Sequence, residues 1–379
     1  MTATSIPAAG AASLSAPAVA WAEPQRAAAF AQWLAQVAPR HQLLPDSLRL
    51  ASADASFRRY FRIDTNGGGA ATRIIMDAPT DKEDSAPFVH VAQLMAGASV
   101  RAPQVLEWDR QNGFLLLDDL GQQTMLDVIN AADADPAASR WLYEQAIDAL
   151  VRWQLASKPG VLPPYDAALL RRELALFPDW YLGKHRNAKL DDAQAQMVER
   201  TFELIVQTNL GSPSVFVHRD FMPRNLMVDA AGLSRLPGAD PAAALGVLDF
   251  QDAVYGPITY DVASLMRDAF LSWDEDFVID MTVRYWQAAR KAGLPVDEDF
   301  GAFYRAVEWM GLQRHLKVAG IFARLTLRDG KPRYLADAPR FVGYIRATAG
   351  RYRELKPLLR LVDAVEGIQS EGGYAFGRV

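Results

Sequence analysis

The chain has no cysteine among its 379 residues, which excludes disulfide bonds and thiolate metal sites. Its five histidines are scattered, and no two of them have the spacing of a zinc site. No apolar stretch approaches the ~20 residues that a membrane-spanning helix needs. A net charge of −5 does not favour general binding to nucleic acid. We therefore expect a cytoplasmic protein, a monomer, with neither a nucleic-acid nor a membrane partner.

Length and composition predict two lobes, because half of the residues are apolar and the chain can bury a large core. Residues 1–22 are rich in Ala, Ser and Pro and lack the basic start of a signal peptide, so we expect a flexible tail there. A second tail is expected at residues 366–379.

Residues 23–120 are expected to form a small, mostly antiparallel sheet with two helices. The first helix begins at Pro24 and is expected to close at Pro39; the second covers about 87–96. Between and after them lie short β-rich segments, with the turn sequence "NGGG" at 66–69. These segments are "SLRLAS", "FRRYFRID", "TRIIMDAP", "QVLEWD" and "GFLLLDDL".

Residues 121–365 are mainly helical in pattern. Asp135 is a helix cap with Pro136 at the first helical position. Two strand-like segments, "NLMVD" and "ALGVLDFQ", interrupt the helices. The expected fold is therefore α+β, with a small antiparallel β-rich N-lobe and a large helical C-lobe. Further helices are expected at 192–208, 259–270, 275–292, 298–326 and 338–364.

The segment "FVHRDFMPRN" at 216–225 concentrates polar side chains in a loop. Asp220 and Asn225 lie five residues apart, and the strand "GVLDF" reaches Asp249 some twenty residues later. If the two flanking strands pair, Asn225 and Asp249 come to the same end of a hairpin. Their oxygen atoms suit Mg²⁺, and Asp220 can accept a proton from a substrate hydroxyl. This is the layout of a kinase catalytic loop; chance polar residues in a surface loop are the alternative.

The catalytic-loop segment and "LDFQDAVYGPITYDVASL" together resemble the aminoglycoside phosphotransferase and choline-kinase group of the protein-kinase-like fold. The resemblance covers roughly residues 45–340. It implies ATP as the phosphoryl donor and Asp249 as a Mg²⁺ ligand. It also implies that Asp261 braces the catalytic loop through the loop backbone, and we assign His218 a structural role beside it.

Five stretches resemble a narrower family, the anomeric kinases of N-acetylmuramate and N-acetylglucosamine used in cell-wall recycling. This resemblance implies transfer of the γ-phosphoryl group to the anomeric hydroxyl of a small amino sugar. A kinase of an amino alcohol or aminoglycoside and a catalytically inactive nucleotide-binding regulator remain alternatives; the basic segment "LQRHLK" favours a neutral or anionic acceptor. The stretches are "DASFRRYFRI", "MDAPTDKED", "GFLLLDDLG", "HRDFMPRNLMV" and "GLQRHLKVAGIFARL".

Nucleotide binding is expected at two places in the N-lobe. The loop "ADASFRRYFR" has small residues that let backbone amides approach phosphates, although it is not glycine-rich. The connection "LLLDDLG" would present its backbone to the adenine, with the two carboxylates facing water or the ribose. Met76 stands where kinases place a phosphate-binding Lys, so Lys82 or an Arg of 58–62 is expected to replace it. The candidate residues are Ser56, Phe57, Arg58, Arg59, Arg62, Asp118, Asp119 and Leu120.

Five residues are candidates for the acceptor site. Arg314 is in phase with the apolar stripe of the 298–326 helix, and a guanidinium there needs a buried partner or a ligand. We expect Arg314 at the rim of the acceptor cleft, facing the carboxylate of N-acetylmuramate, with His315 behind it. Glu173 and Trp180 belong to a helix–turn segment that could reach a sugar, although a Trp at such a position is more often part of the core. Asp252, three residues past Asp249, could face substrate or solvent.

Overall fold

The computed structural model describes residues 19, 21–53, 57–67, 70–131, 135–228 and 245–369. The chain divides into two units, and α2 (Ala86–Gly97) contributes residues to both. None of the helices within the described ranges is long and apolar enough to cross a membrane. The first unit comprises Met1–Val89 and Pro103–Asp119, and the second comprises His90–Ala102 and Leu120–Val379.

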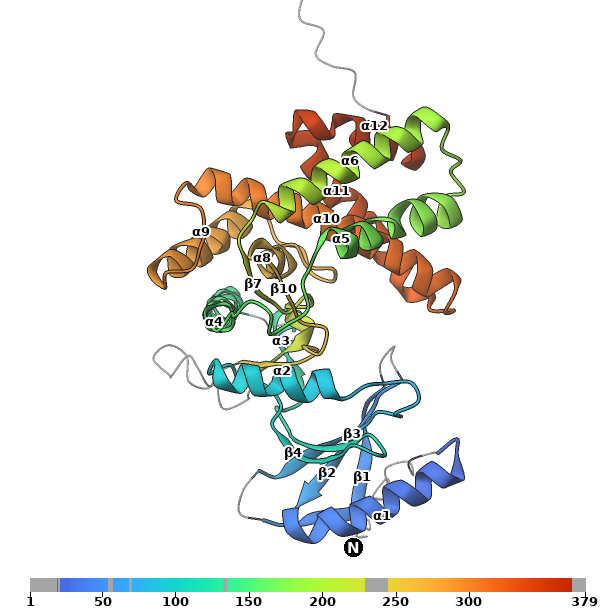
Figure 1. The fold of residues 1–379 in the computed structure, drawn as a ribbon, viewed down its shortest axis with the longest axis vertical. Helices are drawn as coiled ribbons and strands as arrows, with labels where there is room; N and C mark the ends of the chain where they lie inside the picture. Colours follow the sequence, from blue (N-terminus) through green and yellow to red (C-terminus); the bar gives the residue numbers. More distant parts are fainter. Residues whose placement is uncertain are drawn as a thin grey trace, which may run out of the picture. The chain divides into compact units, whose positions relative to one another are not determined.

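The first unit is a five-stranded antiparallel sheet in the order β1-β2-β3-β5-β4 (Figure 1). Helix α1 (Pro24–His41) covers one face, where Phe30 and Leu34 pack against Phe61 and Phe114 from the strands. Alternate residues of a strand share a face, so β2 buries Phe61 and Ile63 together. The antiparallel sheet expected from the sequence is confirmed. Its strands are β1 Leu43–Ala53, β2 Arg59–Thr65, β3 Thr72–Asp77, β4 Val105–Asp109 and β5 Phe114–Asp118.

Helix α10 (Phe300–Leu327) is the central element of the second unit, because it contacts α5, α6, α8, α9 and α11. Gly320 lets the segment Phe177–His185 approach, since a Cβ there would lie 2.3 Å from the Leu176 carbonyl oxygen. The other helices are α3 Met125–Ile129, α4 Pro136–Leu155, α5 Ala167–Leu174, α6 Asp192–Leu210, α8 Thr259–Met266, α9 Glu275–Lys291, α11 Ala338–Arg351 and α12 Lys356–Glu366.

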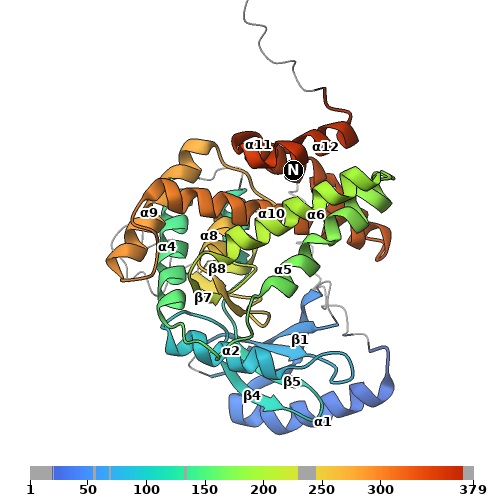
Figure 2. The same cartoon turned by 45° about the horizontal axis from the view of Figure 1, so that its top comes forward.

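Two antiparallel ladders lie among these helices. Strand β7 (Ser214–Val217) pairs with β10 (Val254–Pro257) and packs against α4 (Figure 2). Strand β8 (Leu226–Val228) pairs with β9 (Leu245–Val247) on one side and with β6 (Gln123–Thr124) on the other. Residues 218–225 join β7 to β8, and residues 248–253 join β9 to β10. The pairing therefore brings these two loops to the same place.

The structure corrects several helix boundaries. The helix expected over 338–364 is two helices, because Pro357 has no N–H and its ring is tolerated only in the first turn of α12. Helix α8 ends at Met266 rather than near residue 270, where the Asp268 carboxylate instead accepts the Ala269 N–H (2.6 Å). Pro39 does not close α1, which continues to His41.

Two further points remain. One is an element whose form the sequence did not indicate, and the other concerns residues that the structure does not describe. The π-helical segment Phe177–His185 was not predicted. Most of the expected tails, 1–22 and 366–379, and the last two residues of the "NGGG" turn lie outside the described residues.

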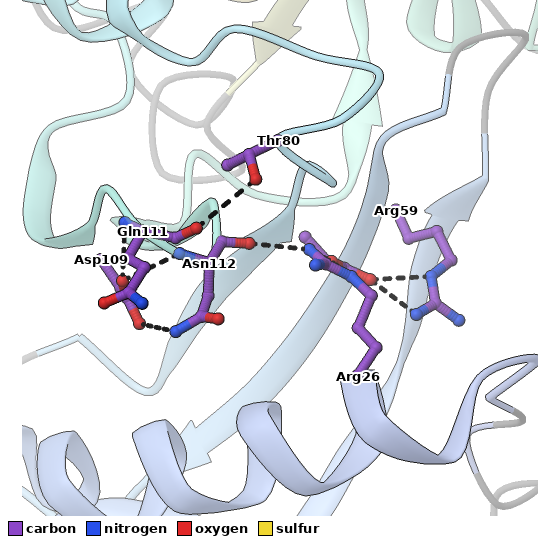
Figure 3. Close-up of polar contacts among 7 residues, drawn as sticks. Arg26, Arg59, Thr80, Asp109, Gln111 and Asn112 are labelled. Carbon is purple, nitrogen blue, oxygen red and sulfur yellow. Dashed lines mark hydrogen bonds and ion pairs between the residues drawn. The ribbon is translucent and has the colours of Figure 1, made fainter.

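Asp77, at the end of β3, is completely buried and joins three parts of the first unit. Figure 3 shows Arg26, Arg59, Asp109 and Asn112, which belong to this network. One oxygen accepts from Nε of Arg26 in α1 (2.8 Å), and the other accepts from Nε of Arg59 in β2 (2.9 Å). Arg26 also donates to the Asn112 carbonyl (3.0 Å) in the turn between β4 and β5. The Asp109 carboxylate accepts three hydrogen bonds within that turn.

We expect Asp77→Ala to lower the free energy of unfolding by about 3 kcal/mol, because a buried acceptor shared by two arginines is lost. Urea unfolding measures this loss. Asp64→Ala is the matched control: Asp64 pairs with Arg49 at 2.8 Å, but the two side chains are 41% and 34% exposed. Its loss should be below about 1 kcal/mol. Equal losses in the two variants would contradict a joining role for Asp77.

Candidate active site

The loops 218–225 and 248–253 place three of the expected residues together. The Asn225 side-chain amide donates to the Asp220 carbonyl (2.9 Å) and to Oδ2 of Asp249 (3.4 Å). The Leu248 N–H donates to the Asn225 carbonyl (2.9 Å). Asn225 directly precedes β8, and Asp249 follows the end of β9 by two residues. Both therefore lie at the same end of the β8–β9 pair.

His218 connects the two loops and is fully buried. Its Nδ1 accepts the Asp220 N–H (3.2 Å), so the ring proton is on Nε2, which donates to the Leu248 carbonyl (3.0 Å). Burial lowers the pKa of His218 to about 4, and the nearby Asp220 carboxylate only partly opposes this. The imidazole is therefore neutral at physiological pH, and its tautomer is set by the backbone.

Asp261, near the start of α8, holds the loop from the other side. Its two oxygens accept the backbone N–H groups of His218 (2.7 Å) and Arg219 (3.0 Å). Burial raises the pKa of Asp261 to about 7, although both N–H donors favour the charged form. The contact is to the loop backbone, so Asp261 orients the loop without occupying the space around Asp220.

Both loops contain a residue with left-handed backbone conformation. Arg219 has φ 78° and Asp249 has φ 64°. Such conformations disfavour residues other than glycine, and they concentrate where the surrounding structure enforces an unusual geometry. The two positions adjoin or include the expected catalytic and metal-binding carboxylates. The left-handed backbone thus interrupts regular strand geometry directly before Asp220 and at Asp249.

The side chains at the hairpin end offer oxygen atoms, which are the ligands that Mg²⁺ prefers. The Asn225 amide nitrogen is directed at Asp220 and Asp249, so its oxygen is the atom left for a metal. Among the described residues, no group of three or more His, Cys, Asp or Glu side chains is arranged as a metal site. Mg²⁺ needs fewer protein ligands than that, because water and phosphate oxygens complete its shell. Asn225 and Asp249 therefore fit a nucleotide-bound Mg²⁺.

Three cations surround Asp220. Arg219 is its neighbour in the loop, whereas Arg314 and Lys317 come from α10. Burial raises the pKa of Asp220, but Lys317, Arg314 and Arg219 outweigh it, so the pKa is below its usual value. Asp220 is thus ionised at neutral pH and able to accept a hydrogen bond from a hydroxyl group.

Glu173 holds two of these cations in place. Its Oε1 lies 2.6 Å from Arg219 Nη2 and 3.2 Å from Lys317 Nζ, and its other oxygen accepts from the Tyr165 hydroxyl. Lys317 also donates to the Tyr260 hydroxyl (3.0 Å). Both oxygens of Glu173 already have protein partners, which makes it a support of the site rather than a group that meets the acceptor.

Two features of the site were not predicted from the sequence: the role of Lys317 and the contacts of Arg219. Lys317 lies one turn after Arg314 in "LQRHLK", which is the signal that two cations share a helix face. Residues 173, 219 and 317 are too far apart in the chain for any local pattern to reveal their contact.

Arg314 is not at a rim, because it is only 1% exposed. Its Nη2 lies 3.9 Å from the sulfur of Met222, two residues past Asp220. His315 is also buried and stacks on Tyr344, with ring centroids 4.7 Å apart. Burial and the adjacent Arg314 lower the pKa of His315 to about 3, so it is a neutral packing residue.

The other two acceptor candidates are Trp180 and Asp252, and no contact among the described residues joins either of them to this cluster. Trp180 is half-buried in the π-helical segment, with the Lys184 ammonium 3.5 Å from its ring centroid. Asp252 is exposed in the loop 248–253. Neither makes a contact that links it to Asp220.

The candidate nucleotide residues of the first unit are mostly engaged with carboxylates. Arg59 pairs with Asp77 and lies over the Trp21 ring at 4.2 Å, and Arg62 makes a two-pronged pair with Asp119 (2.5 and 3.0 Å). Arg58 is buried and lies 3.1 Å from Glu83.

The remaining nucleotide candidates differ in exposure. Phe57 is 61% exposed, with the Lys82 ammonium 5.1 Å from its ring centroid, whereas Ser56 lies outside the described residues. Asp118 accepts the Gln104 N–H (2.5 Å), so neither Asp118 nor Asp119 simply faces water. Leu120 is buried, and the missing side chain of Gly246 makes room for it.

Fold and loop geometry are those of a protein-kinase-like phosphotransferase. The model of the phosphotransferase enzyme family matches residues 47–300, which is more than half of the chain. The chain belongs to this family.

Curated relatives cover most of the chain. An N-acetylmuramate/N-acetylglucosamine kinase of Pseudomonas aeruginosa is 50% identical over 84% of this chain and 88% of the relative. A protein of the same name from Neisseria meningitidis is 46% identical over 93% of this chain and 100% of the relative. Among solved structures, an amicoumacin kinase in complex with AMP-PNP and Ca²⁺ has a TM-score of 0.55 at 14% identity, covering 85% of this chain and 96% of that one. The last similarity concerns the fold.

The buried neutral His218 predicts a pH dependence of stability. Its pKa falls from 6.5 in the unfolded chain to about 4 in the folded protein, so the unfolded chain binds the proton more tightly. The contribution is therefore complete above pH 6.5 and is lost as the pH falls through 4. His218→Asn cannot titrate, so between pH 7.5 and pH 5 the wild type should lose about 2 kcal/mol relative to this variant.

Urea unfolding at the two pH values measures this difference. His90→Asn, at an exposed position, is the control and should show a much smaller pH-dependent difference from the wild type. A constant gap between the wild type and His218→Asn at both pH values would contradict a neutral, buried His218.

Proposed function

We propose that this chain is an ATP-dependent sugar kinase. It transfers the γ-phosphoryl group of ATP to the anomeric hydroxyl of N-acetylmuramate or N-acetylglucosamine and produces the sugar 1-phosphate. The observation that carries the proposal is the convergence of Asp220, Asn225 and Asp249 on two loops held by paired strands. Relatives bearing this activity in their names, 46–50% identical over most of the chain, supply the acceptor.

Asp220 would orient the anomeric hydroxyl and receive its proton. The lowered pKa makes Asp220 a weak base, which suits phosphoryl transfer through a loose transition state, where positioning and electrostatics dominate. Arg219 and Lys317 keep this carboxylate ionised and lend positive charge to the region where phosphoryl charge develops. Mg²⁺ held by Asn225 and Asp249 would neutralise charge on the nucleotide phosphates.

The nucleotide would contact the first unit through the loop before β2 and the backbone after β5. Arg59 and Arg62 are held by Asp77 and Asp119, so their role is to shape the sheet. Lys82, beside the exposed Phe57, is then the first candidate to replace the lysine that kinases carry at the position of Met76, and Arg58, which pairs with Glu83, is the second. Met76 itself is fully buried between neighbouring strands.

The acceptor class follows from charge. Two buried cations of α10 act on Asp220, which disfavours a cationic amino alcohol or aminoglycoside. Phosphoryl transfer requires the side chains of Asp220, Asn225 and Asp249, and all three are present. Their presence disfavours an inactive nucleotide-binding regulator. We place the activity in the cytoplasm, in a monomer that serves peptidoglycan recycling. ADP release with a panel of amino sugars, choline and aminoglycosides tests the proposal; release with neither amino sugar would refute it.

Asp220→Asn should reduce kcat by roughly 10²–10⁴-fold, the usual effect of a positioned proton acceptor. The Asn side chain keeps the shape, so nucleotide affinity should stay within about twofold. Steady-state ADP release and calorimetric titration with a non-hydrolysable ATP analogue measure the two quantities. Turnover near the wild-type rate would exclude Asp220 from this role.

Asp249→Ala should abolish turnover and raise the Mg²⁺ concentration needed for nucleotide binding, because one of two protein ligands is lost. Nucleotide binding titrated against Mg²⁺ checks this without relying on activity. Asp252→Ala, three residues further in the same loop and exposed, is the matched control. An unchanged Mg²⁺ requirement in Asp249→Ala would place the metal elsewhere.

A further inference from the structure

Two buried groups of opposite charge in the second unit each have an atom without a hydrogen bond. Arg314 and Asp268 are each 1% exposed. Within the part of the chain that the structure describes, no hydrogen bond reaches Nη1 of Arg314 or Oδ2 of Asp268. Leaving such groups unpaired inside a protein is costly, so their retention calls for a bound partner.

The two groups lie on adjoining elements, since the carbonyl of Arg267, next to Asp268, is 3.4 Å from Nε2 of His315, next to Arg314. They do not form an ion pair. Burial raises the pKa of Asp268 to about 6, and Arg314 is the strongest of the groups that oppose the rise. Yet no oxygen of Asp268 lies within ion-pair distance of Arg314 among the described contacts. Arg314 also touches Met222 in the catalytic loop and lowers the pKa of Asp220. The pair therefore belongs to the neighbourhood of the catalytic carboxylate.

The chemistry of the two free atoms selects the ligand. A guanidinium N–H can only donate and a carboxylate oxygen can only accept, so one group that does both satisfies them together. A hydroxyl group does both. A ligand carboxylate would pair with Arg314 but would be repelled by Asp268. The site therefore does not suit the carboxylate of N-acetylmuramate, which was the partner expected for Arg314.

We propose that Arg314 and Asp268 bind one ring-substituent hydroxyl of the acceptor sugar, the guanidinium donating to it and the carboxylate accepting from it. This inference rests on the proposed function, since it takes the acceptor to be an amino sugar. N-acetylmuramate carries its lactyl ether on O3, so the hydroxyls shared with N-acetylglucosamine beyond the anomeric one are those on C4 and C6. Recognition of a shared hydroxyl accounts for an enzyme that uses both sugars.

Both side chains are held ready for this contact. Oδ1 of Asp268 accepts the Ala269 N–H (2.6 Å), and the nearby Phe270 N–H also favours the charged carboxylate. Oδ2 has no hydrogen bond from the described residues. The preceding residue, Arg267, is fixed through its carbonyl, which lies 3.4 Å from Nε2 of His315, next to Arg314. The stacked ring of His315 thus joins the residue before Asp268 to the residue after Arg314, which is a positioning role.

The experiment combines Asp268→Asn and Arg314→Met with 4-deoxy and 6-deoxy N-acetylglucosamine. The wild type should lose at least about tenfold in kcat/KM with one of the two deoxy sugars. Each variant should raise KM for both N-acetylated sugars by a similar factor and should no longer distinguish that deoxy sugar from its parent. KM for ATP should change less than twofold.

Asp363→Asn is the matched control, because Asp363 is a buried aspartate paired with Arg346 at 2.5 Å. It should lower the melting temperature and leave both sugar KM values unchanged, whereas Asp268→Asn should not lower the melting temperature. Unchanged sugar KM in both site variants, with lowered stability, would overturn the proposal in favour of a structural water. A loss confined to N-acetylmuramate would overturn it in favour of carboxylate binding.

The proposed function and this site can fail separately. A wild type inactive on both amino sugars refutes the proposed function. The deoxy comparison is then made with whichever sugar of the panel is phosphorylated. If the removal of no single hydroxyl from that sugar lowers kcat/KM, the proposed hydroxyl site is also overturned.

Discussion

The pairing of β7 with β10 and of β8 with β9 is the constraint on which the site depends. Two loops that are separated along the chain meet because the strands on each side of them are hydrogen-bonded to one another. His218 then joins the loops through one imidazole, and Asp261 fixes the backbone of the first. Among the described residues, Asp220 owes its position to these backbone contacts, because no hydrogen bond holds its carboxylate there.

Helix α10 supplies the electrostatics that the loops lack. It brings Lys317 and Arg314 into the interior, where Glu173 pairs with Lys317 and with Arg219 of the loop and so balances only part of the positive charge. Burying charges without full pairing lowers stability, and such sites are characteristic of function rather than of packing. The close approach of Leu176 at Gly320 anchors α10 to the chain just after α5, the helix that carries Glu173, so packing and charge placement have the same origin.

The sequence was sufficient to predict features that depend on residues close together in the chain. It was not sufficient to predict contacts between residues far apart in the chain. The spacing of Asp220, Asn225 and Asp249 foretold their convergence, since strand pairing follows from short apolar segments around a loop. The partners of Arg59 and Arg62 were not foreseen, because Asp77 and Asp119 reach them across strands. The rim position of Arg314 was wrong for a related reason: helical phase places a residue on a face, but only the packing of α8 and α10 decides that this face is buried.

The left-handed backbone at Asp249 has a consequence for how this site can evolve. Aspartate and asparagine adopt this conformation more readily than other side chains with oxygen ligands, because their short polar groups are compatible with it. A glutamate there would carry the same charge, but the left-handed backbone would be less favourable for it. Its longer side chain would also move the carboxylate outward. Two constraints therefore limit the residue at this position: the metal requires an oxygen ligand, and the left-handed backbone favours a short polar side chain. Substitutions that satisfy both are confined to aspartate and asparagine.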